Sequence, residues 1–180
     1  ASSQALLDEA GSVLFEGNDQ HPLLQRLTDD AQARALIAAP LLVCTVDHLT
    51  PATESLRGGR QIAPMLRLLT GDLVLDEPDD FDMADLPALT RLVHWAGLLG
   101  SRVLLSSATL PPALVEGLFL AYRAGRAVYQ QHRSERPGEP VNICCLWIDE
   151  FHQTTQDCAG GAAFREAHAQ YVHKRVAKLK

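Results

Sequence analysis

The stretch "GDLVLDEPDDFD", residues 71 to 82, runs from an apolar segment directly into a cluster of carboxylates. If the apolar segment is a buried strand of a parallel sheet, its end lies at the edge where such sheets carry their chemistry. An Asp there can hold Mg²⁺ through water, and a Glu after it can orient the water that attacks a nucleotide. Asp76 and Glu77 are therefore candidate catalytic residues, and Asp79 in the same stretch is a third. The alternative is an acidic loop that only caps a helix beginning at Asp85.

A second polar stretch, "VLLSSATLPP" at residues 103 to 112, ends the next apolar run along the chain. Ser107, Ala108 and Thr109 by themselves fit a strand end with a helix N-cap at Thr109. In order after Asp76-Glu77-Pro78-Asp79, the stretch resembles motif III of superfamily 2 helicases, and the acidic stretch resembles motif II. In that superfamily the two hydroxyls link the nucleotide site to the nucleic-acid site. The resemblance therefore implies a coupling role for Ser107 and Thr109.

Transporter-type ATPases are a competing resemblance, because they carry a strand ending in Asp-Glu-Pro after a signature with glycines and glutamine. Here Gly58, Gly59, Arg60 and Gln61 precede the acidic strand. However, the Leu-Ser that should come before the glycines is missing, and no switch His follows the strand after Glu77. The sequence therefore favours the helicase interpretation over the transporter.

A narrower resemblance extends over roughly residues 1 to 180, with its specific motifs between 40 and 126. The segments that carry it are "LLVCTVDHLTPATES", "GDLVLDEPDDFD" and "LVHWAGLLGSRVLLSSATLPPALVEGLFLAYRAGR". They look like the CRISPR-associated helicase–nuclease of type I interference, subtype I-F. Within the first segment, "TVDHL" resembles the part before motif II that touches the DNA backbone. This makes Thr45, Asp47 and His48 candidates for DNA contact.

The resemblance implies an ATP-dependent enzyme that translocates on single-stranded DNA in antiviral defence, with an attached HD-type nuclease. ATP and Mg²⁺ are the implied cofactors, and Asp76 would contact Mg²⁺ through water only when ATP is bound. The implied partners are single-stranded DNA, an RNA-guided surveillance complex and the CRISPR integrase. A cytoplasmic location follows from the same resemblance.

Several parts of such an enzyme are missing from the sequence. It has no G-x-x-x-x-G-K-[ST] loop to cradle phosphates, no second lobe, and no His-Asp nuclease dyad, since Asp47-His48 has the reversed order. The abrupt start at Ala1 suggests a piece of a longer chain. We therefore expect this chain to be inactive by itself, to bind no ATP tightly, and to need the remainder of the polypeptide. A non-catalytic docking module with inherited motifs stays open as the alternative.

Composition limits the other possibilities. The net charge is −6 and the isoelectric point about 5.6, so there is no broad basic surface for nucleic acid. No apolar run approaches the roughly 18 residues of a membrane span, and no signal peptide is recognisable, so no membrane partner is expected. The 4 cysteines lack metal-binding spacing and are predicted to be buried cytosolic thiols.

The expected fold class is α/β, a partial RecA-like (P-loop NTPase-type) parallel sheet flanked by helices. Apolar runs predict buried strands at 41–46, 73–75, 102–106 and 141–148, in a sheet covered on both faces. One helix is expected to end at Gly100, and another to run from Pro112 to near Gly125. The expected apolar faces are Leu86, Leu89, Leu92, Val93, Ala96 and Leu99 in the first of these helices, and Phe164, Ala167, Tyr171, Val172, Val176 and Leu179 in a tail helix. Residues 1–132 would form the lobe, 133–140 a linker, and 141–180 a strand and helix leading to the second lobe.

Overall fold

A computed structural model describes residues 22–27, 29, 31–54 and 61–179 of the chain. The chain divides into two compact units, Ala1–Thr45 and Val46–Lys180. The described part of the first unit contains two short helices, α2 (Pro22–Leu27) and α3 (Ala31–Ala38). All of the described strands and the longer helices belong to the second unit. The division at a 133–140 linker remains a prediction.

The strand predicted at Leu41–Val46 does not form, so this prediction was wrong. Residues 42–45 have no regular secondary structure, and the 3-10 helix η1 (Val46–His48) follows them. A strand is stable only with a partner, and no described strand pairs with this segment. Leu41 and Val43 are 76% and 87% exposed, so the apolar run that suggested a strand is uncovered.

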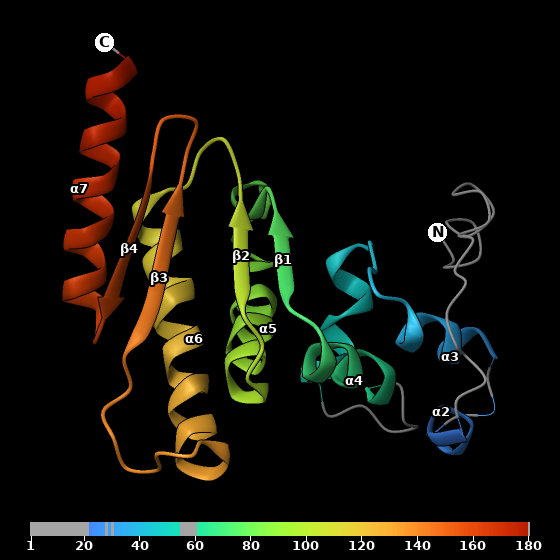
Figure 1. Ribbon diagram of the computed structural model, residues 1–180. Helices are drawn as coiled ribbons and strands as arrows, with labels where there is room; N and C mark the ends of the chain where they lie inside the picture. Colours follow the sequence, from blue (N-terminus) through green and yellow to red (C-terminus); the bar gives the residue numbers. More distant parts are fainter. Residues whose placement is uncertain (1–21, 28, 30, 55–60, 180) are drawn as a thin grey trace. The chain divides into compact units, whose positions relative to one another are not determined.

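Two parallel strands joined by a helix form the centre of the second unit (Figure 1). β1 (Leu73–Asp76) and β2 (Val103–Ser106) pair along their whole length, and α5 (Leu86–Leu99) connects them. This confirms the predicted β–α–β connection. The predicted apolar face of α5 is also confirmed, since its members are buried or packed on the core: Leu86, Leu89, Leu92, Val93, Ala96 and Leu99. Gly100 ends the helix with φ of 95°, a conformation that glycine adopts without strain.

A shorter helix, α4 (Ile62–Thr70), leads into β1, and the 3-10 helix η2 (Thr50–Thr53) packs against it. The buried Ser101 hydroxyl donates a hydrogen bond to the Leu68 carbonyl oxygen, and the Tyr122 hydroxyl donates to the Ser101 carbonyl at 3.0 Å. Ser101, two residues before β2, is thereby hydrogen-bonded to one helical residue before it in the sequence, Leu68, and to one after it, Tyr122.

The long helix α6 (Pro112–Arg133) packs along α5, and two glycines allow the close approach. A Cβ on Gly125 would lie 2.0 Å from the His94 carbonyl oxygen, and a Cβ on Gly97 would lie 2.4 Å from the Tyr122 carbonyl oxygen. The predicted end of the helix near Gly125 was therefore wrong. This glycine is in the helix interior because it permits packing, and the helix continues to Arg133.

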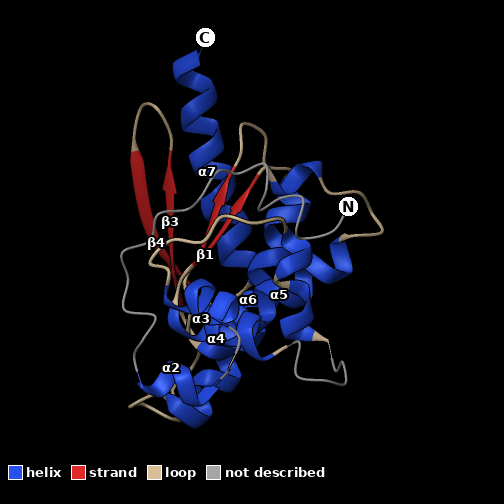
Figure 2. Cartoon of the chain, turned by 90° about the vertical axis from the view of Figure 1, so that its right-hand side faces the viewer, coloured by secondary structure: helices blue, strands red, loops and turns tan. Residues whose placement is uncertain are grey.

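β3 (Ile143–Ile148) and β4 (Gln153–Cys158) form an antiparallel hairpin that is separate from the parallel pair (Figure 2). β3 confirms the strand predicted at 141–148, with a later start. β4 was not predicted, because its sequence is polar and only Thr154 and Cys158 escape exposure. The expectation of a wholly parallel sheet is thus wrong for this part of the chain.

The last helix, α7 (Gly161–Leu179), packs with α6 against the face of the hairpin that carries Trp147 and Cys158. Phe119 of α6 stacks on Phe164 of α7 with ring centroids 4.4 Å apart, and Trp147 of β3 lies 5.6 Å from Phe164. The predicted apolar face holds for the first half of the helix, where Phe164, Ala167 and Tyr171 are buried. In the second half it does not, since Val172, Val176 and Leu179 are exposed.

The parallel pair is covered on one face only, contrary to prediction. Leu73 and Leu75 point into the core, whereas Val74 and its register partner Leu104 are 57% and 55% exposed. Alternate residues of a strand point to opposite faces, so one whole face of this small sheet is bare in the described chain. None of the described helices is long and apolar enough to cross a membrane.

Candidate functional site

The carboxyl ends of β1 and β2 lie side by side and bring the two polar stretches to one edge of the parallel pair (Figure 1). Asp76 is the register partner of Ser106, and the Glu77 N–H donates to the Ser106 carbonyl oxygen at 2.7 Å. Glu77 has φ of 46° and is the one described non-glycine residue in the left-handed region. Such strain persists only where the surrounding structure holds it. The chain then turns into the 3-10 helix η3 (Pro78–Asp80), in which Pro78 is buried.

Both hydroxyls of the second stretch reach carboxylates of the first. Ser107 Oγ lies 2.5 Å from Asp79 Oδ1 and 2.8 Å from Glu77 Oε2, while the Thr109 hydroxyl donates to Asp79 Oδ2. The Thr109 N–H in turn donates to Ser107 Oγ at 3.1 Å. A hydroxyl has a single proton, so Ser107 can donate to only one of these carboxylates at a time. We refer to these four residues as the hydroxyl–carboxylate cluster.

Asp79 is the centre of this cluster. The hydrogen bond from Ser107, followed by that from Thr109, lowers the pKa of Asp79 below its ordinary value. Both carboxylate oxygens lie within hydrogen-bond distance of a hydroxyl, so the end of the neighbouring strand holds the orientation of this carboxylate. Ala108, between the two hydroxyl residues, is exposed and has no polar side-chain atom that could join the cluster.

The alternative roles for these residues as helix caps do not hold. The N-cap position of α6 is Pro111, so Thr109 does not cap that helix. Asp85 occupies the N-cap position of α5 without a side-chain bond, which corrects its predicted role. Instead, Asp82 Oδ1 accepts the N–H groups of Ala84 at 2.8 Å and Asp85 at 3.2 Å. Asp82 thus holds the turn that precedes α5, a role that sequence reasoning missed, and Asp79 takes no part in it.

The donor set at the strand end fits a hydrated Mg²⁺. Asp76 ends β1 as an exposed residue, and Glu77 beside it is exposed as well. Mg²⁺ keeps several waters and prefers one or two carboxylates together with phosphate oxygens. Two adjacent carboxylates open to solvent match that preference.

The candidates for DNA contact lie in another part of the chain. Asp47 and His48 belong to η1, and Thr45 immediately precedes that helix at the end of the first unit. The Asp47 carbonyl oxygen accepts the Thr50 hydroxyl at 3.3 Å. The hydrogen bonds of the hydroxyl–carboxylate cluster are made by Glu77, Asp79, Ser107 and Thr109. Gly58, Gly59 and Arg60, the start of the transporter-like signature, lie outside the described residues.

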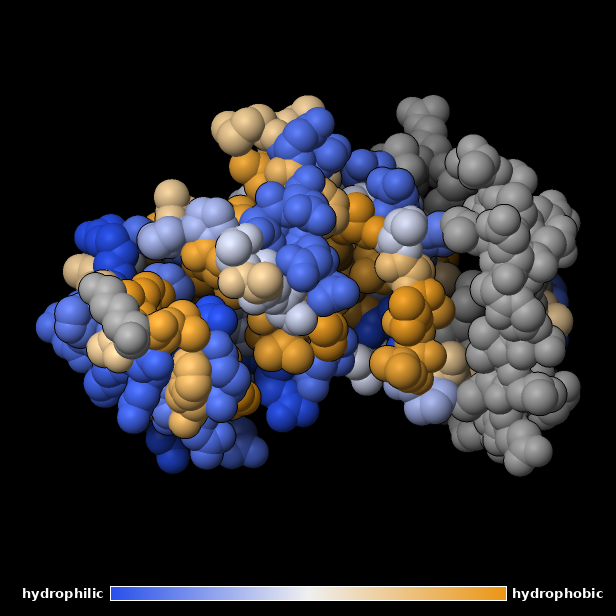
Figure 3. All heavy atoms as spheres, turned by 90° about the horizontal axis from the view of Figure 1, so that it is seen from above, coloured by the Kyte–Doolittle hydropathy of each residue, from blue (hydrophilic) through white to orange (hydrophobic). Residues whose placement is uncertain are grey.

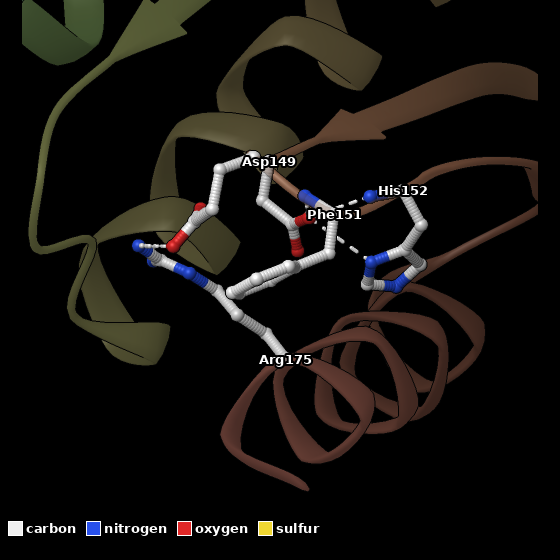
Figure 4. Close-up of polar contacts among 5 residues, drawn as sticks. Asp149, Phe151, His152 and Arg175 are labelled. Atoms are coloured by element: carbon white, nitrogen blue, oxygen red, sulfur yellow. Dashed lines mark hydrogen bonds and ion pairs between the residues drawn. The ribbon is translucent and has the colours of Figure 1, made fainter. Parts of the chain in front are cut away.

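A second polar cluster, not predicted from the sequence, closes the turn between β3 and β4 (Figure 4). Asp149 Oδ1 accepts the N–H groups of Phe151 at 2.7 Å and His152 at 2.8 Å, and lies 3.0 Å from His152 Nδ1. Glu150 pairs with Arg175 of α7 at 3.3 Å. Burial raises the pKa of Asp149, but the hydrogen bonds outweigh it and bring the pKa to about 2. An Asp directly after an apolar strand is typical of such turns and was the available signal.

Two curated proteins match nearly the whole chain. A CRISPR-associated nuclease/helicase Cas3 of subtype I-F/YPEST from Pseudomonas aeruginosa is 60% identical over 99% of the chain. A protein of the same description from Pectobacterium atrosepticum is 52% identical over 99% of the chain. The chain is similar to one segment of these Cas3 proteins. The resemblance to the subtype I-F helicase–nucleases is thereby confirmed, while no protein-family profile matches the chain.

The similarity concerns a minor part of each Cas3 protein. The chain spans 16% of the length of either relative, or about a sixth. Both names describe a nuclease and a helicase, and they apply to proteins about six times as long. The activity of a whole Cas3 protein is therefore a matter of proposal for this segment.

Proposed function

We propose that this chain is part of the first RecA-like lobe of an ATP-dependent DNA helicase of the Cas3 type. The observation that carries the proposal is the pairing of both hydroxyls, Ser107 and Thr109, with Asp79 across adjacent strand ends. A helicase must transmit a change at its nucleotide site to its nucleic-acid site. A hydrogen-bonded bridge between two neighbouring strand ends is a direct physical means of doing so.

In this proposal each carboxylate has a separate task. Asp76 holds Mg²⁺ through water, and Glu77 orients the water that attacks the terminal phosphate. When bound with ATP, Mg²⁺ would supply positive charge against the phosphate oxygens. Glu77 has a left-handed backbone conformation, so the turn after β1 sets the direction in which its side chain leaves the backbone. Asp79 accepts hydrogen bonds from the two hydroxyls, so a displacement of this turn would also move the Ser107–Thr109 loop.

The bare face of the parallel pair supports the RecA-like assignment. Parallel strands occur almost only in sheets that are covered on both faces, yet Val74 and Leu104 are exposed here. The relatives extend far beyond the matched segment, so further layers from the same polypeptide are available to cover this face. The phosphate-cradling loop and the second lobe would come from the same source.

The remaining properties of the whole protein rest on the resemblance to Cas3. They are translocation on single-stranded DNA, cutting by an HD nuclease domain, recruitment by an RNA-guided surveillance complex and association with the CRISPR integrase. Thr45, Asp47 and His48 are the proposed DNA contacts in this segment. The proposed location is the cytoplasm.

The experiment that tests the proposal is the DNA-stimulated ATPase activity of the whole protein with Glu77→Gln. This change keeps size and hydrogen bonding but removes the charge that orients water. We expect hydrolysis to fall by about 10²-fold or more, equivalent to roughly 2.7 kcal/mol of transition-state stabilisation, while ATP still binds. Asp80→Asn is the matched control, because it removes an exposed carboxylate from the same turn. Wild-type hydrolysis by Glu77→Gln would refute the catalytic role and favour the docking-module alternative.

A further inference from the structure

The second half of α7 carries apolar residues for which the described chain provides no partner. Val172, Val176 and Leu179 are 39%, 43% and 61% exposed, and their spacing of four and three residues places them on one face of the helix. At the left of Figure 3, where α7 is seen from its C-terminal end, hydrophobic residues lie at the surface among charged ones. Three such residues in a row on one face are more than scattered surface exposure.

This face continues into a hollow between two helices. A groove of about 640 Å³ is lined by Pro112 and Ala113 from the start of α6, and by Phe164, Ala169, Val172 and Val176 from α7. Its rim is polar, because Glu116 and Arg165, which form an ion pair between α6 and α7, also line it. An apolar floor with a polar rim is the form of a site that receives an amphipathic helix. We refer to it as the α6–α7 groove.

His168, also on the wall of the α6–α7 groove, carries a hydrogen-bonding atom without a partner. The residue is 7% exposed, and its Nδ1 lies 3.2 Å from Trp147 Nε1. Indole is only a donor, so Nδ1 accepts this bond and the neutral ring carries its proton on Nε2. Within the described residues, Nε2 is buried and unpaired. A buried donor without an acceptor is unfavourable, so the described residues leave the polar contacts of this wall of the groove incomplete.

We propose that the α6–α7 groove binds a helical segment of the same polypeptide from outside residues 1–180. Stable interfaces between separate molecules bury roughly 800 Å² on each partner, and Val172, Val176 and Leu179 are the exposed large apolar side chains of α7. A segment on the same chain has an effective concentration in the millimolar range and needs far less contact. The Cas3 relatives are about six times as long as the chain, so such a segment is available.

The position of the groove gives the contact a consequence. Pro112 is the first residue of α6, and the loop that ends there carries Ser107 and Thr109. A segment that binds the first turn of α6 would therefore contact residues that follow shortly after the hydroxyls that bind Asp79. The docking itself does not depend on the ATPase proposal, and the two can fail independently.

The test is photo-crosslinking in the whole protein, with p-benzoylphenylalanine in place of Val176. The matched control carries the same probe at Gln170, which is exposed on α7 but does not line the groove. We expect the probe at 176 to crosslink one peptide outside residues 1–180 of the same molecule, and the probe at 170 not to reach it. Adding Val172→Asp should lower the yield at position 176 by at least about tenfold, the factor that ~1.4 kcal/mol produces.

Mixing isotopically light and heavy protein separates contacts within one molecule from contacts between copies. Crosslinks that join light to heavy chains would show a second copy in the groove and overturn the proposal. Crosslinks to another protein, crosslinks confined to residues 1–180, or equal yields at positions 176 and 170 would overturn it as well. Glu77→Gln protein should give the same crosslink as wild type, which keeps this result separate from the ATPase assay.

Discussion

Ser107 Oγ lies 2.5 Å from Asp79 Oδ1, although 28 residues separate the two in the chain. The contact exists because β1 and β2 are parallel neighbours with their carboxyl ends at one edge. It joins the two stretches that sequence reasoning had linked only by order and spacing.

Replacing both hydroxyls, as Ser107→Ala with Thr109→Ala, should separate ATP hydrolysis from DNA unwinding. The hydroxyls touch Asp79 and Glu77 but are not the proposed catalytic groups, so much of the ATPase activity should remain. The unwinding rate of the whole protein should fall at least about tenfold, or ~1.4 kcal/mol in coupling. Ser106→Ala is the control, since this exposed hydroxyl lies outside the cluster. Equal loss of both activities would mean that the hydroxyls support the catalytic turn itself.

Gly125→Ala should destabilise the second unit by forcing α5 and α6 apart. The added Cβ would lie 2.0 Å from the His94 carbonyl oxygen and 2.7 Å from the Leu98 nitrogen, and neither backbone atom can move freely. We expect a loss of about 1–3 kcal/mol, as for other overpacked sites. Urea-dependent proteolysis of the whole protein, followed at cleavage sites within residues 86–133, measures it.

The control for this change is Gly117→Ala in the same helix. A Cβ there meets nothing within 4 Å, so only helix propensity changes. The variant should be more stable by up to about 1 kcal/mol. If both variants shift stability in the same direction, close packing at Gly125 is not the reason for this glycine.

Asp149 should make the β3–β4 turn sensitive to acid. Its pKa in the folded chain is about 2, below the ordinary value of about 3.9. A lowered pKa contributes stability that is complete above about pH 4 and is lost as the pH falls towards 2. Asp149→Asn should therefore lower the urea midpoint at neutral pH and flatten its dependence between pH 4 and 2. Asp157→Asn, an exposed site on β4, is the control and should change neither.

The neighbouring thiols Cys144 and Cys145 should differ in alkylation rate. Burial, reinforced by Cys158 nearby, raises the pKa of Cys145 to about 12, and burial also raises the pKa of Cys158. Cys144 is exposed. Since the thiolate is the reacting form, iodoacetamide at pH 8 should modify Cys144 more than about tenfold faster than Cys145 or Cys158. Peptide mapping at timed intervals measures this, and similar rates for all three would show that the hairpin opens to solvent.

Local patterns in the sequence determined much of the second unit. The acidic strand, the run ending in Ser107 and the helix between them follow from apolar spacing and from Gly100, because each signal lies within a few residues of its effect. The chemistry proposed for Asp76, Glu77 and Asp79 was likewise available from residue type and order. The left-handed backbone of Glu77 carried no such signal, since nothing in its side chain requires that conformation.

Contacts between distant residues decided the rest. Gly125 has the sequence features of a helix end, yet it lies inside α6 because α5 approaches it closely. Leu41–Val46 has the composition of a strand and remains unpaired, because strand formation requires a neighbour that the described chain does not provide. The polar β4 forms because β3 offers an edge and Asp149 closes the turn. Composition limits the secondary structure that a segment can form, whereas the segments that it pairs or packs with decide which structure forms.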